Sequence, residues 1–289
     1  MGKTKKREQF DVNNKTSKTA HGSFSEEAMN SGSSLSLRRA ALVIASLSGF
    51  LTPFMGSSVI VSIPEIAGEF KMDAVLQTWI VTAYLLAAAM FLVPFGKIAD
   101  IHGRRRIYKY GIILDAIAAI LCAVSISAPW FVLFRFAQGF GDAMIFGTST
   151  AILVAVYPFK DRGKVLGIVI AATYFGLSSG PFIGGLLTQN FGWRSVFISI
   201  LVLDLAIIIL VYSRLKGEWT GAKGEKFDLL GSAVYGFTLF SMIYGFTVLP
   251  DFSAYWLIAS SLLALVIFII WESKSSHPVL ELKLFRHNS

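Results

Sequence analysis

Three polar residues, Arg135, Gln138 and Asp142, lie within a long apolar run at residues 131–154. An ionisable side chain at such a position is costly in a bilayer, so it is expected to face a wet cavity or a partner. Arg135 and Asp142 are seven positions apart, which places them on one face of a helix and about 10 Å apart along its axis. They can therefore line one cavity and handle charge there without forming a close pair. The structural alternative, in which Arg135 tethers a neighbouring helix, stays open.

A charged segment at residues 96–106 separates two further apolar stretches. It contains Gly96 and Gly103, which favour tight turning of the backbone, then Asp100, and basic residues that begin with Arg104 and Arg105. Basic residues in so short a loop hold that loop on the cytoplasmic side of a membrane. Asp100 is placed to accept charge-assisted hydrogen bonds from an arginine or from the N-terminus of a neighbouring helix. The segment therefore predicts a gating loop that latches the cytoplasmic side.

A glycine-rich stretch at residues 163–185 contains Gly176, Gly180, Pro181, Gly184 and Gly185. Glycines spaced four residues apart let two helix backbones approach closely. A proline inside a helix removes a backbone donor and bends the helix. The stretch therefore predicts a bent, closely packed gating helix.

Enzymatic chemistry finds no support in the sequence. Residues 176–180 also fit the Gly-x-Ser-x-Gly of serine hydrolases, but that motif needs a histidine within reach, and all four histidines lie in the expected tail or loops. The sequence contains no His-Glu-x-x-His, no phosphate-binding loop and no cysteine cluster, and Cys122 is its single cysteine. We therefore expect no catalytic residue, no metal site and no cofactor.

The composition is typical of a polytopic membrane protein. Of the 289 residues, 54% are hydrophobic and only 15% are charged, whereas soluble domains usually carry about 25% charged residues. The net charge of +8 could suggest nucleic-acid binding, but the basic residues are scattered among loops and form no single patch. We therefore expect a lipid bilayer as a partner and no nucleic acid.

Eight apolar runs are long enough to span a bilayer as helices, since a span needs about 20 residues. The runs lack the polar alternation of a membrane barrel. The sequence thus predicts an all-α membrane protein: a six-helix bundle followed by two further transmembrane helices. The expected spans are residues 40–63, 79–95, 110–128, 131–154, 166–187, 196–212, 229–249 and 255–271.

The basic residues alternate between the two sides of these spans. The tail, the even-numbered loops and the C-terminal end carry nearly all of the 26 Lys and Arg residues, whereas the opposite loops carry only Lys71 and Arg194. The side with more positive charge is cytoplasmic, so we expect both termini inside and a location in the cell membrane. Trp residues, including Trp193, are then expected at the outer ends of the spans.

The apolar runs and the loops between them divide the chain into five predicted parts. Residues 1–38 are polar and poor in large apolar side chains, which predicts a disordered cytoplasmic tail. Residues 39–213 form the six-helix bundle, residues 214–226 a cytoplasmic loop, and residues 227–272 two linker helices. Residues 273–289 form a cytoplasmic end that we expect to be truncated.

Several of these motifs resemble those of one transporter family. The pattern Gly-x-x-x-Asp-x-x-Gly-Arg-Arg-Arg from Gly96 resembles the loop between the second and third helices of the major facilitator superfamily. Arg135 with Gln138 resembles the fourth-span motif of that family, whose arginine is associated with proton coupling. Residues 176–185 resemble its antiporter motif, which points to efflux, and residues 54–64 resemble the first-span motif of its fourteen-helix drug:proton antiporters.

The resemblance departs from the family at its acids. The acid of the first-span motif falls on Met55, and residues 40–63 contain neither Asp nor Glu. If a proton drives transport, Asp142 is therefore the first candidate carrier. Asp115 and Asp204 are further buried acids, in the third and sixth spans, which lie at the periphery of the bundle in this family. For each of them a structural hydrogen bond and a proton-carrying role stay open.

The resemblance implies a secondary active transporter that exports small organic compounds or drugs by ion antiport, with a proton as the expected ion. It also implies a small-molecule substrate and a missing C-terminal bundle or partner half, because the chain ends where further spans follow in fourteen-helix members. The alternative is a truncated protein or half-transporter that acts only as a membrane interaction subunit.

Overall fold

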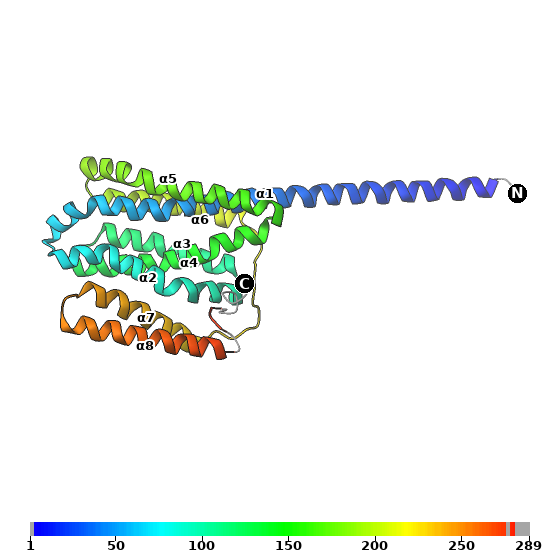
Figure 1. Cartoon of the computed structure of the whole chain (residues 1–289). Coiled ribbons are helices and arrows are strands. Elements are labelled where there is room, and N and C mark those ends of the chain that lie inside the picture. The colour runs from blue at the N-terminus through cyan, green and yellow to red at the C-terminus, as the bar shows by residue number, and fades with distance from the viewer. Residues whose placement is uncertain (1–2, 276–277, 281–289) are drawn as a thin grey trace.

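The computed structural model describes residues 3–275 and 278–280, and it describes side chains from residue 35 onward. These residues form eight helices and, within the described ranges, no strand, which confirms the expected all-α fold (Figure 1). The helices are α1 (Lys3–Phe70), α2 (Ala74–His102), α3 (Arg104–Ala123), α4 (Ala128–Val156), α5 (Phe159–Phe191), α6 (Arg194–Arg214), α7 (Leu229–Thr247) and α8 (Phe252–Lys274).

The first six helices form a bundle around α4. This helix packs against α1, α2 and α3, while α1 packs along α5 and α6, and α3 packs along α6. The hairpin of α7 and α8 lies outside the bundle and contacts it through α2 (Figure 1). Arg135 and Asp142, the charged residues expected to line a cavity, therefore lie on α4, which has neighbouring helices on most sides.

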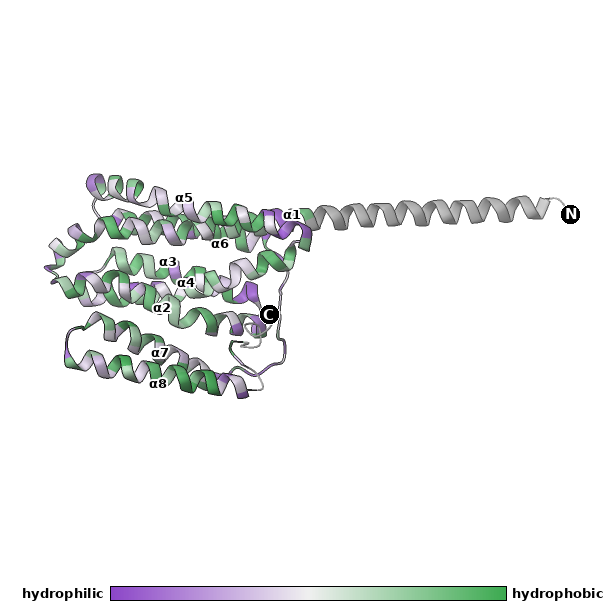
Figure 2. Ribbon diagram, viewed as in Figure 1, coloured by the Kyte–Doolittle hydropathy of each residue, from purple (hydrophilic) through white to green (hydrophobic). Residues whose placement is uncertain are grey.

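Apolar residues occur in every helix of the bundle (Figure 2), and they are exposed as well as buried. On α6, for example, Phe197 and Ile207 are buried, whereas Ile198, Val202 and Ile209 are exposed. A helix that is apolar all round suits a membrane span with one side facing lipid. Seven described helices, all except α3, are long and apolar enough to cross a membrane, as expected for a multi-pass membrane protein.

Helix α3 is the exception because its first turns carry basic residues, and Asp115 lies further along it. It nevertheless packs lengthwise between α4 and α6. An eighth span therefore remains a prediction that rests on packing. The helices generally extend past the apolar runs, because polar residues at the membrane surface continue the same helices.

The junction of α2 and α3 differs from the expected turn at residues 96–106. Helix α2 continues through Gly96 and Asp100 to His102, and α3 begins at Arg104, so Gly103 alone separates the two helices. Gly103 has φ 115°, a conformation that favours glycine. The expectation that Gly96 turns the chain is wrong. Gly96 lies inside α2 and faces Gly147 of α4. A Cβ added to Gly147 would lie 3.6 Å from the backbone nitrogen of Gly96.

The backbone from Lys3 onward continues α1 and projects away from the bundle (Figure 1). The disordered cytoplasmic tail expected over residues 1–38 stays a prediction. Residues 1–2, and residues 276–277 and 281–289 of the expected C-terminal end, lie outside the described residues.

Candidate functional site

Asp142 of α4 lies where α1, α2 and α4 meet. Its side chain is only 4% exposed. Thr52 of α1 donates a hydrogen bond from Oγ1 to Asp142 Oδ1 at 2.6 Å, and the Tyr84 hydroxyl of α2 donates to Oδ2. Two donors directed at the two oxygens suit an ionised carboxylate, which only accepts hydrogen bonds. Helices α1 and α2 thus provide a specific environment for this acid.

Arg135 lies two turns earlier on α4 and is 1% exposed. Its Nη1 donates to Gln138 Oε1 at 2.5 Å, and its Nε donates to the Ile80 carbonyl of α2 at 3.3 Å. Its guanidinium carbon lies 4.4 Å from the ring centroid of Tyr84, a cation–π contact. Tyr84 therefore touches Arg135 with its ring and Asp142 with its hydroxyl, and it links two charges that lie apart along α4.

Close backbone approach places Tyr84 between these charges. A Cβ at Gly139 would overlap the Tyr84 carbonyl, so α2 can lie against α4 only because residue 139 has no side chain. The sequence analysis missed Tyr84, because a tyrosine in an apolar run is usually a packing residue. Thr52 is one of the small and hydroxyl residues of the first span. Only the polarity of that group indicated in the sequence that Thr52 could contribute to a site.

A cavity of about 280 Å³ opens beside Asp142. Thr52, Tyr84 and Asp142 form part of its wall, whereas Arg135 and Gln138 lie behind the wall and do not line it. The cavity thus combines one hydrogen-bonded acid with an apolar lining, the usual make-up of a small-molecule site. The remaining lining residues are Leu85, Ala88, Ala89, Leu92, Ala143 and Phe146.

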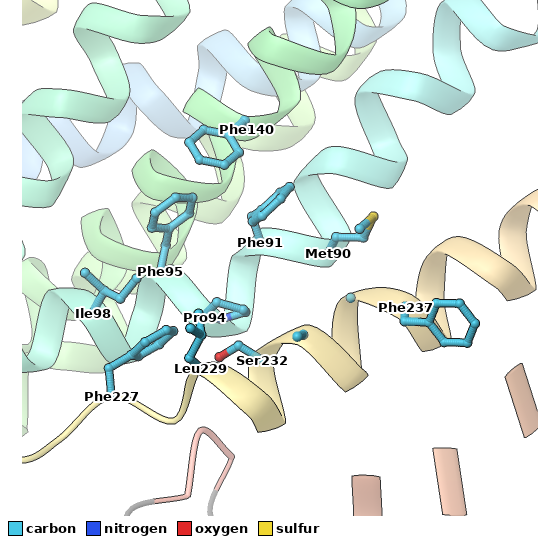
Figure 3. Close-up of a pocket in the computed structure, with 12 residues that line it drawn as sticks. Met90, Phe91, Pro94, Phe95, Ile98, Phe140, Phe227, Leu229, Ser232 and Phe237 are labelled. Carbon is cyan, nitrogen blue, oxygen red and sulfur yellow. The ribbon is translucent and has the colours of Figure 1, made fainter. Parts of the chain in front are cut away.

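A second cavity, of about 340 Å³, lies between α2, α4 and α7. Figure 3 shows Phe91 and Phe95 of α2 grouped with Phe140 of α4. The Phe140 ring centroid is 4.5 Å from that of Phe91 and 4.7 Å from that of Phe95. Among the described lining residues Ser232 supplies the polar side chain, so this cavity offers apolar contact and no ionisable group.

The expected latch residues meet at the α2–α3 junction. Arg104 Nε lies 2.7 Å from Asp100 Oδ1, and Arg104 Nη1 donates to the Ala151 carbonyl of α4 at 3.1 Å. Asp100 therefore pairs with an arginine, one of its two expected partners, and the arginine ties the junction to α4. Arg105 takes part through its backbone N–H, which donates to Glu218.

The segment between α6 and α7, residues 215–228, packs on this junction. The backbone N–H groups of Gly221 and Ala222 each donate to the Asp100 carbonyl at 3.0 Å. Glu218 Oε1 accepts from the backbone N–H of Arg105 at 2.8 Å, which places an acid at the N-terminus of α3. The sequence analysis treated this segment as a loop and missed the contact, because nothing local to residues 215–228 indicates where they dock.

The glycines of the expected gating helix face α1. A Cβ at Gly176 would overlap the Phe50 carbonyl, one at Gly180 would overlap the Ser57 hydroxyl, and one at Gly184 would lie 2.6 Å from Ser58 Cβ. By contrast, a Cβ at Gly185 would find its nearest neighbour, Val61, at 3.6 Å. Pro181 is exposed and α5 continues through it.

At the opposite end of the bundle, Trp193 and Arg194 connect α6 to α1. Arg194 forms two hydrogen bonds with Glu69, at 2.6 and 2.7 Å, and Trp193 Nε1 donates to the same carboxylate at 2.8 Å. Trp193 is 1% exposed and packs against Phe131 and Phe197. Trp193 is the residue before α6, so it lies at an end of that span, and aromatic packing buries its ring.

The family can now be assigned. The sequence profile of the Major Facilitator Superfamily matches residues 45–279, from within α1 to beyond the end of α8. The chain belongs to this superfamily. The assignment confirms the resemblance drawn from the motifs, and it confirms the expectation that the chain is not an enzyme.

Curated relatives of the superfamily include drug-resistance proteins. The chain is 29% identical over 257 residues to the multidrug resistance protein Stp of Mycobacterium tuberculosis, which covers 86% of this chain and 47% of that protein. It is 30% identical over 278 residues to the methylenomycin A resistance protein of Bacillus subtilis, covering 92% of this chain and 57% of that protein. The chain thus spans about half the length of the curated relatives it matches.

A solved structure shares the fold. The crystal structure of the peptide transporter POT in complex with alafosfalin superposes with a TM-score of 0.62 at 14% identity, over 81% of this chain and 52% of that one. A bacterial homologue of the human lysosomal transporter Spinster gives a TM-score of 0.53 at 19% identity, over 72% of this chain. These likenesses establish the helical fold of the superfamily.

Proposed function

We propose that this chain forms the N-terminal half of a secondary transporter that exports small organic compounds in exchange for protons, working with a second helical bundle. The observation that carries the proposal is the position of Asp142, a buried acid in the wall of an apolar cavity. The drug-resistance names of the curated relatives support small organic compounds as the substrate class. The relatives' greater length supports a second bundle.

The cavity supports the chemistry of exchange. Ionised Asp142 is held by Thr52 and Tyr84 and can accept a proton from water that enters the cavity. Protonation removes its charge and weakens both charge-assisted hydrogen bonds. Bound proton and bound substrate can then compete for the same wall of the cavity, which is the requirement for antiport. Arg135 lies behind Tyr84 and supplies a fixed positive charge.

Two surfaces support the gating roles expected from the sequence. The junction of Asp100, Gly103 and Arg104, with residues 215–228 packed on it, holds the end that we propose to be cytoplasmic. In α5 the glycine face is packed against α1, so the gating surface is the opposite face, where Tyr174 and Phe182 are exposed. We propose that both termini lie on the cytoplasmic side of the cell membrane.

A transport assay tests the proposal. The full-length gene is expressed, everted membrane vesicles are prepared, and uptake of a fluorescent cationic drug is followed while a pH gradient is imposed. We expect gradient-driven uptake that Asp142→Asn abolishes, whereas Asp251→Asn, on the exposed turn between α7 and α8, leaves it intact. Unchanged uptake and pH dependence in Asp142→Asn would remove the assignment of the proton carrier.

The second candidate function is a membrane interaction subunit without transport of its own, which the half-length coverage of the relatives favours. The same vesicles separate the two functions. Uptake requires alternating access of two bundles around a midplane site. If the 289-residue chain binds another membrane bundle but no combination of the two drives uptake, the interaction role replaces the transporter role.

A further inference from the structure

A pair of acids lies inside the bundle on the side of α4 away from the cavity. Asp115 of α3 is 1% exposed and Asp204, at the middle of α6, is 0% exposed. The two side chains interact directly with each other. Neither residue belongs to the lining of the cavity beside Asp142. They form a second buried polar site, which the proposed exchange reaction does not use.

Close packing fixes the position of Asp115. A Cβ at Gly141 of α4 would lie 3.0 Å from the Asp115 backbone nitrogen, and one at Gly111 would lie 2.9 Å from the Gly141 carbonyl. Helices α3 and α4 therefore touch backbone to backbone at this level. Asp204 comes from the other side, on a face of α6 whose other buried residues are apolar: Val196, Phe197, Ile200, Ile207 and Val211.

Three of the four carboxylate oxygens of this pair receive no hydrogen bond from an N–H or O–H donor among the described residues. They are Oδ1 of Asp115 and both carboxylate oxygens of Asp204. Gln138, which is fully buried, directs its side chain at Asp115, and its Nε2 is also unpartnered there. Unpaired buried charges are strongly unfavourable. Protonation removes this cost, because a neutral carboxyl group can donate a hydrogen bond to its neighbour.

Counting the buried charges identifies what is missing. Among the side chains that the structure describes, the core of the six-helix bundle holds the acids Asp115, Asp142 and Asp204 and one base, Arg135. Asp142 accepts two hydrogen bonds, and Tyr84 contacts both Asp142 and Arg135. The negative charge of Asp142 therefore balances the positive charge of Arg135. The carboxylates of Asp115 and Asp204 then remain uncompensated. Two protons restore neutrality, and two carboxyl groups in contact share protons readily.

The other groups that face the pair add no net charge, because Asp142 balances Arg135 and the rest are neutral. They are Arg135 and Asp142 from α4, Tyr84 from α2, and Tyr108 and Cys122 from α3. From α1, Ser48 faces this region through its hydrogen bond with Tyr108. A metal ion does not fit, because no group of three or more metal-ligating side chains occurs among the described residues.

We propose that Asp115 and Asp204 form a second proton-binding site, distinct from the acid in the cavity wall. In its full state each carboxyl carries one proton. Release of one proton to solvent leaves a single proton bridging the two carboxyl groups, and the free Nε2 of Gln138 is placed to donate to the remaining negative charge. The site is independent of the proposed transport function, since it requires only the six-helix bundle.

Infrared difference spectroscopy of the purified 289-residue chain in lipid nanodiscs tests this directly. A protonated carboxyl gives a C=O stretch that is separate from carboxylate bands and shifts in heavy water. We expect such bands at neutral pH, a loss of part of their intensity as the pH is raised, and removal of this response in Asp115→Asn and in Asp204→Asn. Asp251→Asn, in an exposed turn, is the matched control and leaves the spectrum unchanged.

The outcomes separate this site from the cavity. Asp142→Asn leaves both carboxyl groups of the pair in place, so the bands that Asp115→Asn or Asp204→Asn removes should persist even if transport is abolished. Their loss should occur at a different pH, because Arg135 loses the charge that balances it. The two proposals therefore still fail separately. Bands that persist in both Asp115→Asn and Asp204→Asn would overturn the proposal. Bands that vanish in both variants but do not respond to pH would also overturn it, because they would show a fixed structural hydrogen bond. Thermal unfolding of each variant verifies that the bundle is folded.

Discussion

The seam between α1 and α5 gives the sharpest test of the packing. The substitution Gly176→Ala adds one methyl group where α5 meets the backbone of α1, and its Cβ would overlap the Phe50 carbonyl. A backbone atom cannot rotate out of the way as a side chain can. The two helices must therefore move apart or strain, which is the situation of an overpacked core.

The matched control lies on the same helix. Gly167 is also inside α5, and a Cβ there would meet nothing within 4 Å. Replacing either glycine by alanine gains about 0.5–1 kcal/mol of helix stability. Because this gain is common to both variants, the difference between them isolates the steric cost, which is about 1–3 kcal/mol. That cost corresponds to a melting temperature lower by about 2–12 °C for Gly176→Ala than for Gly167→Ala.

The measurement is thermal unfolding of both variants in the same detergent, followed by tryptophan fluorescence and by circular dichroism. We expect Gly167→Ala to unfold at or slightly above the wild-type temperature, and Gly176→Ala below Gly167→Ala by this margin of about 2–12 °C. Equal melting temperatures for the two variants would show that α5 does not rest on α1 at Gly176. The reasoning about the seam would then fail, together with the assignment of the gating surface to the outer face of α5.

Further predictions concern single contacts and are measured by unfolding in denaturant. Tyr84→Phe keeps the ring but removes a buried hydroxyl bonded to a carboxylate, so it should cost about 1.5–3 kcal/mol; no loss would contradict that bond. Gly103→Ala should cost more than Gly224→Ala, because both have positive φ but only the former meets a neighbouring side chain. Arg194→Ala breaks a half-exposed ion pair worth under about 1 kcal/mol. Glu69→Ala should cost about 1–3 kcal/mol, because it also strips a buried indole N–H of its acceptor.

The fold followed from the sequence because apolar run length is a local property. Each expected span corresponds to one helix. Most helix ends were misplaced because polar residues outside the apolar layer continue the same helix, whereas α3 and α7 end before the expected spans do, at Ala123 and Thr247. Gly96 shows the limit of local reasoning. Its neighbours are those of a turn, yet it lies within α2 opposite Gly147. A glycine that permits a turn and one that permits close packing look alike in sequence.

The candidate site was only partly predictable for a related reason. A charge within an apolar run identified Arg135 and Asp142, since such residues are rare in spans. Their partners Thr52 and Tyr84 come from other helices, and no spacing along the chain relates them to α4. The contact between Asp115 and Asp204 joins helices α3 and α6, which are separated by two others in sequence. Each acid was visible by itself, but their meeting depends on tertiary packing.

The packing around α4 bears on how such a bundle moves. Gly139 brings α4 against α2, Gly141 brings it against α3, and Gly176 brings α5 against α1. Contacts between backbones cannot slide without steric overlap, and packed interiors shift between discrete arrangements and do not deform continuously. We therefore expect the six helices to move as one rigid unit, with Asp142 keeping Thr52 and Tyr84 throughout. The surfaces left free to change partners are the exposed outer face of α5 and the cavity face of α2, so alternating access would alter contacts there and leave the buried acids in place.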